Sequence, residues 1–277
     1  MPLAFFRRSG DESFLPEPVS CSLWSDDQMH GVAVSALLAS SMEKGLATLG
    51  RTDLRPAKYA VDLFAPARMH EVTPRLRVVR EGKRLCLIDV DLEQDGARVA
   101  RASGLFLLPT ANPDGDIWVS SATPQPPPAD IAPETDQPHV PIFASDDTDW
   151  SNDFAGHQNP SRKRTWQTGV PPVLGERPTP FTAVASIADA ASMVTNWGTH
   201  GVTYINTDIT LVLSRLPVGL EVGLEAMDRT ENDGIAVGTV RVFDRAGVLG
   251  SVTVSALANA RRAVNLGAHE PEDSARV

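Results

Sequence analysis

Two aspartates in this sequence each lie inside an apolar, strand-like run of residues, where an ionised carboxylate is energetically unfavourable. Asp208 stands between Ile205, Ile209 and Leu211, and Asp62 interrupts the run of residues 58–66. An ionised carboxylate among apolar side chains is unfavourable unless it is paired, hydrogen-bonded or used in chemistry. Such a group can serve as a general base that activates water. Asp208 is therefore the first candidate for a catalytic residue.

Each aspartate also has a structural explanation. The Asp208 carboxylate could accept hydrogen bonds from the backbone or from Thr230, and Asp62 is better explained as a relic of an internal duplication than as a second base. The sequence has no GxSxG motif and no Ser-His-Asp order, which argues against a covalent serine hydrolase. Cys21 and Cys86 lie in no CxxC or Cys/His cluster, so we expect inert core thiols, no metal and no cofactor.

Two helices are expected to position these residues. Thr179 and Pro180 are typical of a helix start, and small and apolar residues follow at helical spacing over 181–196. An earlier helix is expected over 31–48, after His30. Because neither has a wide charged face, both are expected to be largely buried.

Four strand-like runs follow each helix, and the turn residues between them predict antiparallel hairpins. The turns include Asp95-Gly96 in the first half and Ala246-Gly247 in the second. The expected strands cover residues 58–66, 73–80, 85–92 and 98–108, then 202–213, 219–227, 234–243 and 250–257. A helix followed by four strands, used twice, indicates a duplication.

A proline-rich stretch separates the two halves. Most of the 22 prolines lie between residues 109 and 180. We therefore divide the chain into an N-terminal repeat (1–108), a connector (109–149) and a C-terminal repeat (150–277). Trp150, Phe154 and Trp166 are too apolar for a free linker, so this part is expected to return to the sheet.

The composition is that of a globular protein, with 277 residues, 42% hydrophobic and 22% charged. A net charge of −10 argues against a nucleic-acid partner, and we favour a solvated surface turn over a phosphate site for residues 162–164 (RKR). No apolar run approaches the roughly 20 residues of a membrane span, and the N-terminal residues lack a signal-peptide core. We expect a cytoplasmic protein.

Several short motifs, in this order in both halves, resemble one known family. They are His30-Gly31, residues 80–84 (REGKR) and 95–100 (DGARVA), then 206–208 (NTD), 228–230 (DRT), Asp233-Gly234 and 247–250 (GVLG). Together they are similar to the type II, TesB-like acyl-CoA thioesterases and cover most of the chain outside the connector. The resemblance implies an α+β double hotdog fold, in which two antiparallel sheets, joined edge to edge, each wrap a long central helix.

The resemblance also implies hydrolysis of a fatty acyl-CoA by water, without a covalent intermediate. In the family an aspartate, a hydroxyl residue and a glutamine hold the water. Asp208 matches the aspartate and Thr230 the hydroxyl residue, whereas Ser255 stands where the glutamine is expected. A helix N-terminus would supply N–H donors to the oxyanion.

Three functions remain open from the sequence. The first is an acyl-CoA thioesterase that uses Asp208, Thr230 and Ser255, and the second is a non-catalytic protein that binds acyl-CoA or lipid. A hotdog hydratase ranks last, because no histidine lies within a dozen residues after Asp208. The oligomeric state is left open, with a homo-oligomer as one option.

Overall fold

The computed structural model describes residues 3–121 and 123–268, and its centre is one large antiparallel sheet. The sheet has 12 strands in the order β10-β9-β11-β16-β17-β18-β15-β5-β8-β7-β6, with β14 beside β18. The first half supplies β5 (Arg55–Leu63), β6 (Thr73–Glu81), β7 (Leu85–Gln94) and β8 (Ala97–Leu107). The second half supplies β9 (Ile142–Ser145), β10 (Thr148–Ser151), β11 (Lys163–Thr168), β14 (Tyr204–Asn206), β15 (Asp208–Leu213), β16 (Glu221–Asn232), β17 (Ile235–Asp244) and β18 (Gly247–Ala258).

Alternating side chains give the sheet an apolar inner face and a polar outer face. In β7, Cys86, Ile88, Val90 and Leu92 are buried on the inner face, and the intervening acidic residues point outward. The hairpin after β7 turns at Asp95 and Gly96, which have φ angles of 51° and 76°. Positive φ at both turn positions is what a tight two-residue hairpin requires, so the predicted turn is confirmed.

The two halves join where β5 pairs with β15. In that pairing Asp208 lies directly opposite Asp62, the residue that corresponds to it in the first half. The sheet is therefore continuous across the junction, and the expectation that the sheets of the two halves join edge to edge is confirmed. Backbone hydrogen bonds along this seam leave no free strand edge between the halves.

The first predicted helix is confirmed, and the second is broken. α1 spans Gly31–Thr48. The second helical region consists of α3 (Pro180–Ile187), a 3₁₀ turn η2 (Ala188–Ala190) and α4 (Ala191–Asn196). The expectation of one long helix over 181–196 was wrong at this turn. The tighter turn contains Asp189, whose side chain bonds outside the helix, and local 3₁₀ geometry often marks such functional positions.

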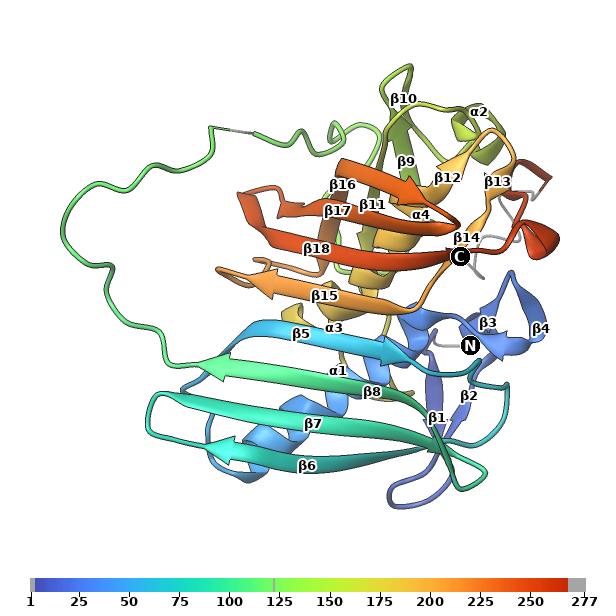
Figure 1. The fold of residues 1–277 in the computed structure, drawn as a ribbon. Helices are drawn as coiled ribbons and strands as arrows, with labels where there is room; N and C mark the ends of the chain where they lie inside the picture. Colours follow the sequence, from blue (N-terminus) through green and yellow to red (C-terminus); the bar gives the residue numbers. More distant parts are fainter. Residues whose placement is uncertain (1–2, 122, 269–277) are drawn as a thin grey trace.

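The helices lie on one face of the sheet, behind it in Figure 1. α1 packs over β6, β7 and β8, and α4 packs over β16, β17 and β18. α1 and α3 also pack against each other. At α3 the N-cap residue Thr179 donates its hydroxyl to the Glu43 carboxylate near the end of α1, at 2.7 Å. The start of α1 contacts η2, so the two helical regions run antiparallel.

The connector leaves the sheet after β8 and returns as extra strands, as its aromatic residues predicted. It arches away from the molecule and comes back to β9, which pairs with β11 (Figure 1). Phe154 and Trp166 are buried and Trp150 is partly buried. β9 lies inside the stretch 109–149, and the proposed division of the chain there stays a prediction.

Short elements complete the described chain. They are β1 (Phe6–Arg8), β2 (Phe14–Pro16), η1 (Pro18–Ser20), β3 (Cys21–Ser22), β4 (Ser25–Met29), α2 (Phe154–His157), β12 (Trp197–Gly198), β13 (Gly201–Val202), η3 (Ala260–Arg262) and η4 (Leu266–Ala268). Cys21 and Cys86 are both buried, as expected. None of the helices in the described ranges is long and apolar enough to cross a membrane.

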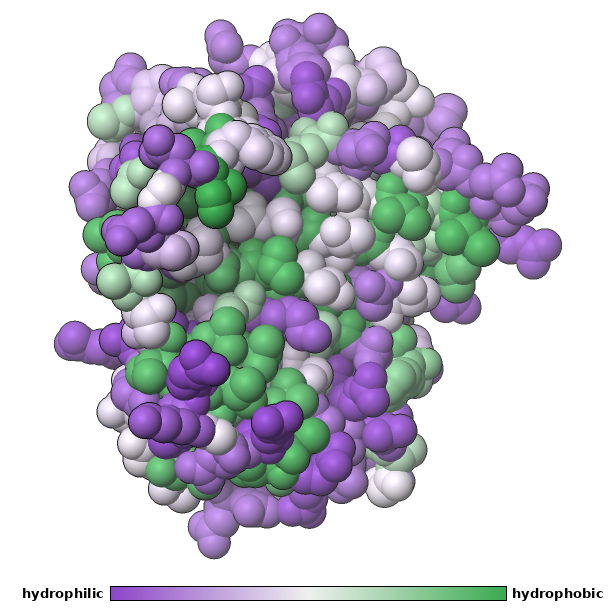
Figure 2. All heavy atoms as spheres, turned by 60° about the vertical axis from the view of Figure 1, so that its left-hand side comes forward, coloured by the Kyte–Doolittle hydropathy of each residue, from purple (hydrophilic) through white to green (hydrophobic). Residues whose placement is uncertain are grey.

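The surface mixes hydrophobic and hydrophilic groups, and the face in Figure 2 has hydrophobic patches between hydrophilic residues. The basic triplet at 162–164 is not the solvated turn that we expected. Lys163 is buried in β11 and donates to the Asn159 side chain at 2.8 Å. Burial lowers the pKa of Lys163 to about 8. Lys163 also donates to the Asn159 carbonyl, so its ammonium group stabilises the loop before β11 and is not available to bind a phosphate.

Candidate active site

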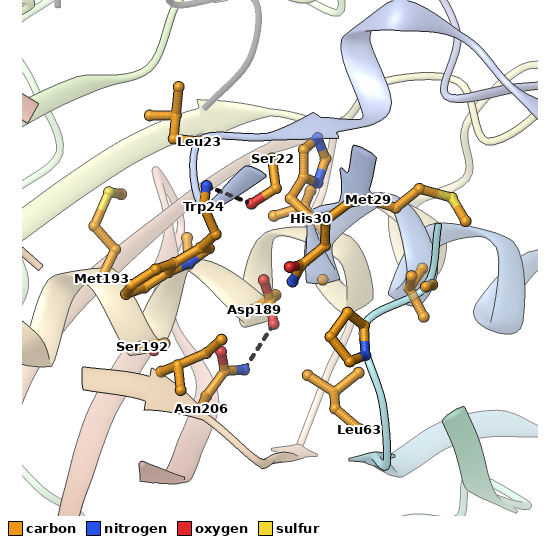
Figure 3. A pocket seen from close by; sticks show the side chains of 18 of the residues that line it. Ser22, Leu23, Trp24, Met29, His30, Leu63, Asp189, Ser192, Met193 and Asn206 are labelled. Atoms are coloured by element: carbon orange, nitrogen blue, oxygen red, sulfur yellow. Dashed lines mark hydrogen bonds between the residues drawn. The ribbon is translucent and has the colours of Figure 1, made fainter. Parts of the chain in front are cut away.

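A cavity of about 300 Å³, called the main cavity below, lies where the two halves meet. Its walls are the hairpin of β3 and β4, the first turn of α1, the loop after β5, η2 with α4, and β14. Most of the wall is apolar: Trp24 and Met193 lie on one side and Leu63 on the other (Figure 3). Such a wall suits an alkyl chain.

Asp189 is the acidic residue in this wall. Its carboxylate accepts a hydrogen bond from the Asn206 side chain at 2.9 Å and another from the Val32 N–H. Burial raises the pKa of Asp189 to about 6, although both hydrogen bonds favour the charged form and lower it. A carboxyl group with a pKa near 6 is still ionised at neutral pH and is a stronger base than an exposed aspartate.

Gly31 allows this carboxylate to reach the start of α1. A Cβ atom on Gly31 would lie 2.2 Å from Asp189 Oδ1, which is closer than any real contact. Gly31 is the first residue of α1, so its N–H has no acceptor within the helix. Gly31 lines the cavity, and its N–H is at the positive end of the helix dipole. Donors of this kind can stabilise an oxyanion.

His30 fixes the first turn of α1 and is neutral. Its Nδ1 accepts from the Ala33 N–H at 3.0 Å, so the ring proton is on Nε2, which donates to the Val19 carbonyl at 2.8 Å. Burial lowers the pKa of His30 to about 4. His30 therefore caps the helix, and it also lines the cavity. A ring with both nitrogens occupied cannot serve as an acid or base at neutral pH.

Gln167 adds a carboxamide to the same wall. It belongs to β11 and is only 7% exposed. Its Nε2 donates to Thr165 Oγ1 at 3.3 Å. Within the part of the chain that the structure describes, no hydrogen bond to its Oε1 is found. The amide can therefore take part in holding a water or a polar ligand atom in the cavity.

The three residues predicted from the sequence lie elsewhere. Asp208 and Ser255 are brought together, since Asp208 Oδ1 accepts the Ser255 N–H at 3.0 Å. Thr230 is separated from Ser255 by one strand, because both face Val237 of β17 from opposite sides. The burial alternation puts Asp208 and Ser255 on the outer face of the sheet, and Thr230 shares that face because it is in register with Ser255 through Val237. None of the three lines the main cavity. Their catalytic role stays a prediction.

Asp189 was missed by the sequence argument, although a signal was present. It is the single charged residue between Thr179 and Trp197, in a segment that is otherwise small and apolar. A single acidic residue on a buried helix must be paired, hydrogen-bonded or used in chemistry, as was argued for Asp208. The helical pattern alone could not show that this position faces the start of α1.

No group of three or more His, Cys, Asp or Glu side chains that could hold a metal ion occurs in residues 3–121 and 123–268. The arrangement offers one carboxylate with a raised pKa, an N–H at a helix start, amides from Asn206 and Gln167, and an apolar chamber. Its chemistry is therefore that of a base beside an anion-stabilising donor.

Both halves of the chain match models of one protein family. Residues 22–107 match the model of the acyl-CoA thioesterase N-terminal domain, and residues 120–257 match that of the acyl-CoA thioesterase C-terminal domain. No curated protein matches the chain.

Solved structures show the same fold at low sequence identity. A tesB protein from Mycobacterium avium subsp. paratuberculosis is 16% identical with a TM-score of 0.61, over 91% of this chain and 95% of that one. A hot dog fold protein of unknown function from Alicyclobacillus acidocaldarius is 17% identical with a TM-score of 0.63, over 91% and 95%. An acyl-CoA thioesterase II from Mycobacterium marinum is 12% identical with a TM-score of 0.59, over 91% and 95%. With both halves matched by its models, this chain belongs to the acyl-CoA thioesterase family.

Proposed function

We propose that this protein hydrolyses a fatty acyl-CoA thioester with water that is activated by Asp189. The observation that carries the proposal is the Asp189 carboxylate, buried in the wall of an apolar cavity with its pKa raised to about 6, against the first turn of α1. We assign the base to this residue and not to Asp208, because Asp208 lies on the outer face and already accepts the Ser255 N–H.

In this mechanism the acyl chain lies along the apolar wall near Leu63 and Met193, and the thioester carbonyl lies at the start of α1. Asp189 takes a proton from water as the water oxygen attacks the carbonyl carbon. The Gly31 N–H stabilises the oxyanion that forms. When the tetrahedral intermediate collapses, the C–S bond breaks and the proton on Asp189 passes to the CoA thiolate. The products are a fatty acid and free CoA.

Asn206 and Gln167 have separate tasks in this proposal. The Asn206 amide holds one oxygen of Asp189, so that the other oxygen can face the water. Gln167 lies in the same wall and can supply the carboxamide that the family resemblance led us to expect at Ser255. Ser255 itself is on the far face of the sheet.

We also interpret the fold as a double hotdog. The support is that α1 packs on strands of its own half, α4 on strands of the other half, and the two halves share one sheet through β5 and β15. The break at η2 fits this interpretation, since it turns Asp189 towards the other repeat.

A protein that binds acyl-CoA without hydrolysing it is the second candidate. The observation that favours it is Ser255, which has no carboxamide at the position where the family is expected to have its glutamine. Loss of one orienting or oxyanion contact can reduce turnover about 10²-fold or more.

Release of free CoA from a panel of acyl-CoAs tests the proposal, with the thiol detected by a chromogenic disulfide. Asp189→Asn should lower turnover by about 10² to 10⁴-fold, as is typical of a lost general base. Asp208→Asn is the matched control, since it makes the same change on the outer face, and it should keep most of the activity. If Asp208→Asn is inactive and Asp189→Asn is not, our assignment of the base is wrong. Saturable acyl-CoA binding without any CoA release would favour the binding protein.

A further inference from the structure

The lining of the main cavity is exposed to solvent at one end and buried at the other. Ala65 and Pro66, in the loop after β5, are exposed lining residues. At the other end the lining residues are Val202, Val264 and Leu266, which are at most 7% exposed and belong to one compact apolar cluster. A ligand that enters from the solvent-exposed end therefore directs its far end towards this cluster.

Trp24 and Met193 cover part of the cluster on its cavity side. Both are partly buried, line the main cavity and pack against the cluster, and both lie on the same side of the cavity in Figure 3. Trp24 is at the turn between β3 and β4, where its N–H donates to Ser22 Oγ at 3.1 Å. Met193 belongs to α4 and also packs against the main core. The two side chains therefore come from different elements and are held by different contacts.

The spacing of Asp189 and Met193 gives the depth of the site. Met193 follows Asp189 by four residues in the helical region of η2 and α4, so the two lie on the same side of it, roughly 6–8 Å apart along its axis. With the thioester carbonyl beside Asp189, an acyl chain that runs along this wall reaches Met193 and Trp24 after only a few carbons. Both side chains are apolar and suit contact with the end of an alkyl chain.

We propose that Trp24 and Met193 end the acyl site, so that they restrict the enzyme to short and medium acyl chains. The inference rests on the proposed function, because it takes the thioester carbonyl to lie at Asp189. Trp24 is the stronger determinant, since its indole is the larger group. The β3–β4 hairpin that carries it is a two-stranded sheet of its own, so a shorter side chain there leaves the large sheet intact. The cluster behind Trp24 is apolar and can then accept more of the chain.

The experiment measures kcat/KM for CoA thioesters of saturated acyl chains of increasing length. In the wild type, kcat/KM should rise by up to about fourfold per added methylene and then fall once the chain end meets Trp24 and Met193. Trp24→Ala should move the optimum to a chain longer by about two carbons or more, because it removes the whole indole. Met193→Ala should move the optimum in the same direction by less. For the first chain beyond the wild-type optimum, Trp24→Ala should raise kcat/KM relative to the optimal chain about tenfold.

Trp150→Ala is the matched control. Trp150 is also partly buried, but it lies in β10 at the edge of the large sheet and does not line the main cavity. This change should leave the preferred chain length as it is. If circular dichroism shows that Trp24→Ala does not fold, Met193→Ala decides in the same way. A wild-type rate that rises through the longest chain, an optimum that neither variant moves, or an equal shift in Trp150→Ala overturns the inference.

Failure of the proposed function gives a different result. If no thioester is hydrolysed, the mechanism at Asp189 is refuted, and equilibrium binding of the same series of acyl-CoAs decides the inference. An affinity that peaks at one chain length in the wild type, and at a longer one in Trp24→Ala but not in Trp150→Ala, supports the proposed end of the acyl site. The same affinity profile in all three proteins refutes it.

Discussion

Replacing Asp189 with asparagine should make the protein more stable while it loses activity. The substitution keeps the size of the side chain and an oxygen that can accept from Asn206 and from the Val32 N–H. It removes the charge that burial makes costly. The stabilisation should depend on pH in a way that the raised pKa of Asp189 defines.

The magnitude follows from the difference in pKa between the folded and unfolded chains. The pKa rises from 3.8 to about 6 on folding, which is about two units, and each unit corresponds to about 1.4 kcal/mol. Below pH 4 the carboxyl is protonated in both states, and folding has no ionisation cost. Between pH 4 and 6 the unfolded chain has lost the proton and the folded chain has kept it, so the cost grows. Above pH 6 it is constant, at most about 3 kcal/mol.

Urea unfolding of wild type and Asp189→Asn at several pH values measures this difference. The variant's gain in unfolding free energy should rise by about 1–3 kcal/mol between pH 4 and 7 and then level off. Ser192→Ala changes a residue of the same cavity wall that does not titrate, so its effect should not vary with pH. A gain that is flat from pH 4 to 8, or a variant that is less stable at pH 8, would refute the idea that Asp189 is a buried ionised carboxylate.

Two more predictions concern the geometry around Asp189, and a third concerns the packing of the sheet. Gly31→Ala should lower turnover at least about 100-fold in a protein that still folds by circular dichroism, because its Cβ displaces the Asp189 carboxylate. Asn206→Leu should move the acidic limb of the pH–rate profile to higher pH, because the hydrogen bond that lowers the pKa of Asp189 is lost; an unchanged limb would contradict this. Gly250→Ala should destabilise the fold by at least about 2 kcal/mol in thermal unfolding, since its Cβ would lie 1.9 Å from the Val212 carbonyl oxygen in the paired strand.

Much of the fold could be predicted from local signals, whereas the site that we propose could not. The hairpin at Asp95 and Gly96 and the helix after His30 have local sequence causes, and both are found. Asp208 was chosen because its neighbours along the strand are apolar. In a sheet with one solvated face, however, those neighbours face the core and the residue between them faces water. The neighbours of a residue in the sequence show that polar and apolar side chains alternate, but they do not show which face of the sheet is exposed to solvent.

The position of Asp189 depends on a contact between distant parts of the chain. Gly31 lies more than a hundred residues before it, and the close approach of the two is fixed by the packing of α1 against η2. No local pattern encodes that packing. The duplication could be read from the repeated order of elements, but the pairing of β5 with β15 that aligns the repeats is likewise a long-range fact.

The antiparallel packing of the two helical regions creates two reciprocal contacts, in each of which a carboxylate of one half meets the helix start of the other. Asp189 meets the start of α1 beside the main cavity, and Glu43 meets the start of α3, where it accepts the Thr179 hydroxyl. In an assembly of two identical chains, any substitution that closed one contact would close both. A single chain with two unlike halves escapes this constraint. Such a chain can keep the contact between Glu43 and the start of α3 for structure alone, while the contact between Asp189 and the start of α1 borders a cavity that can hold a substrate.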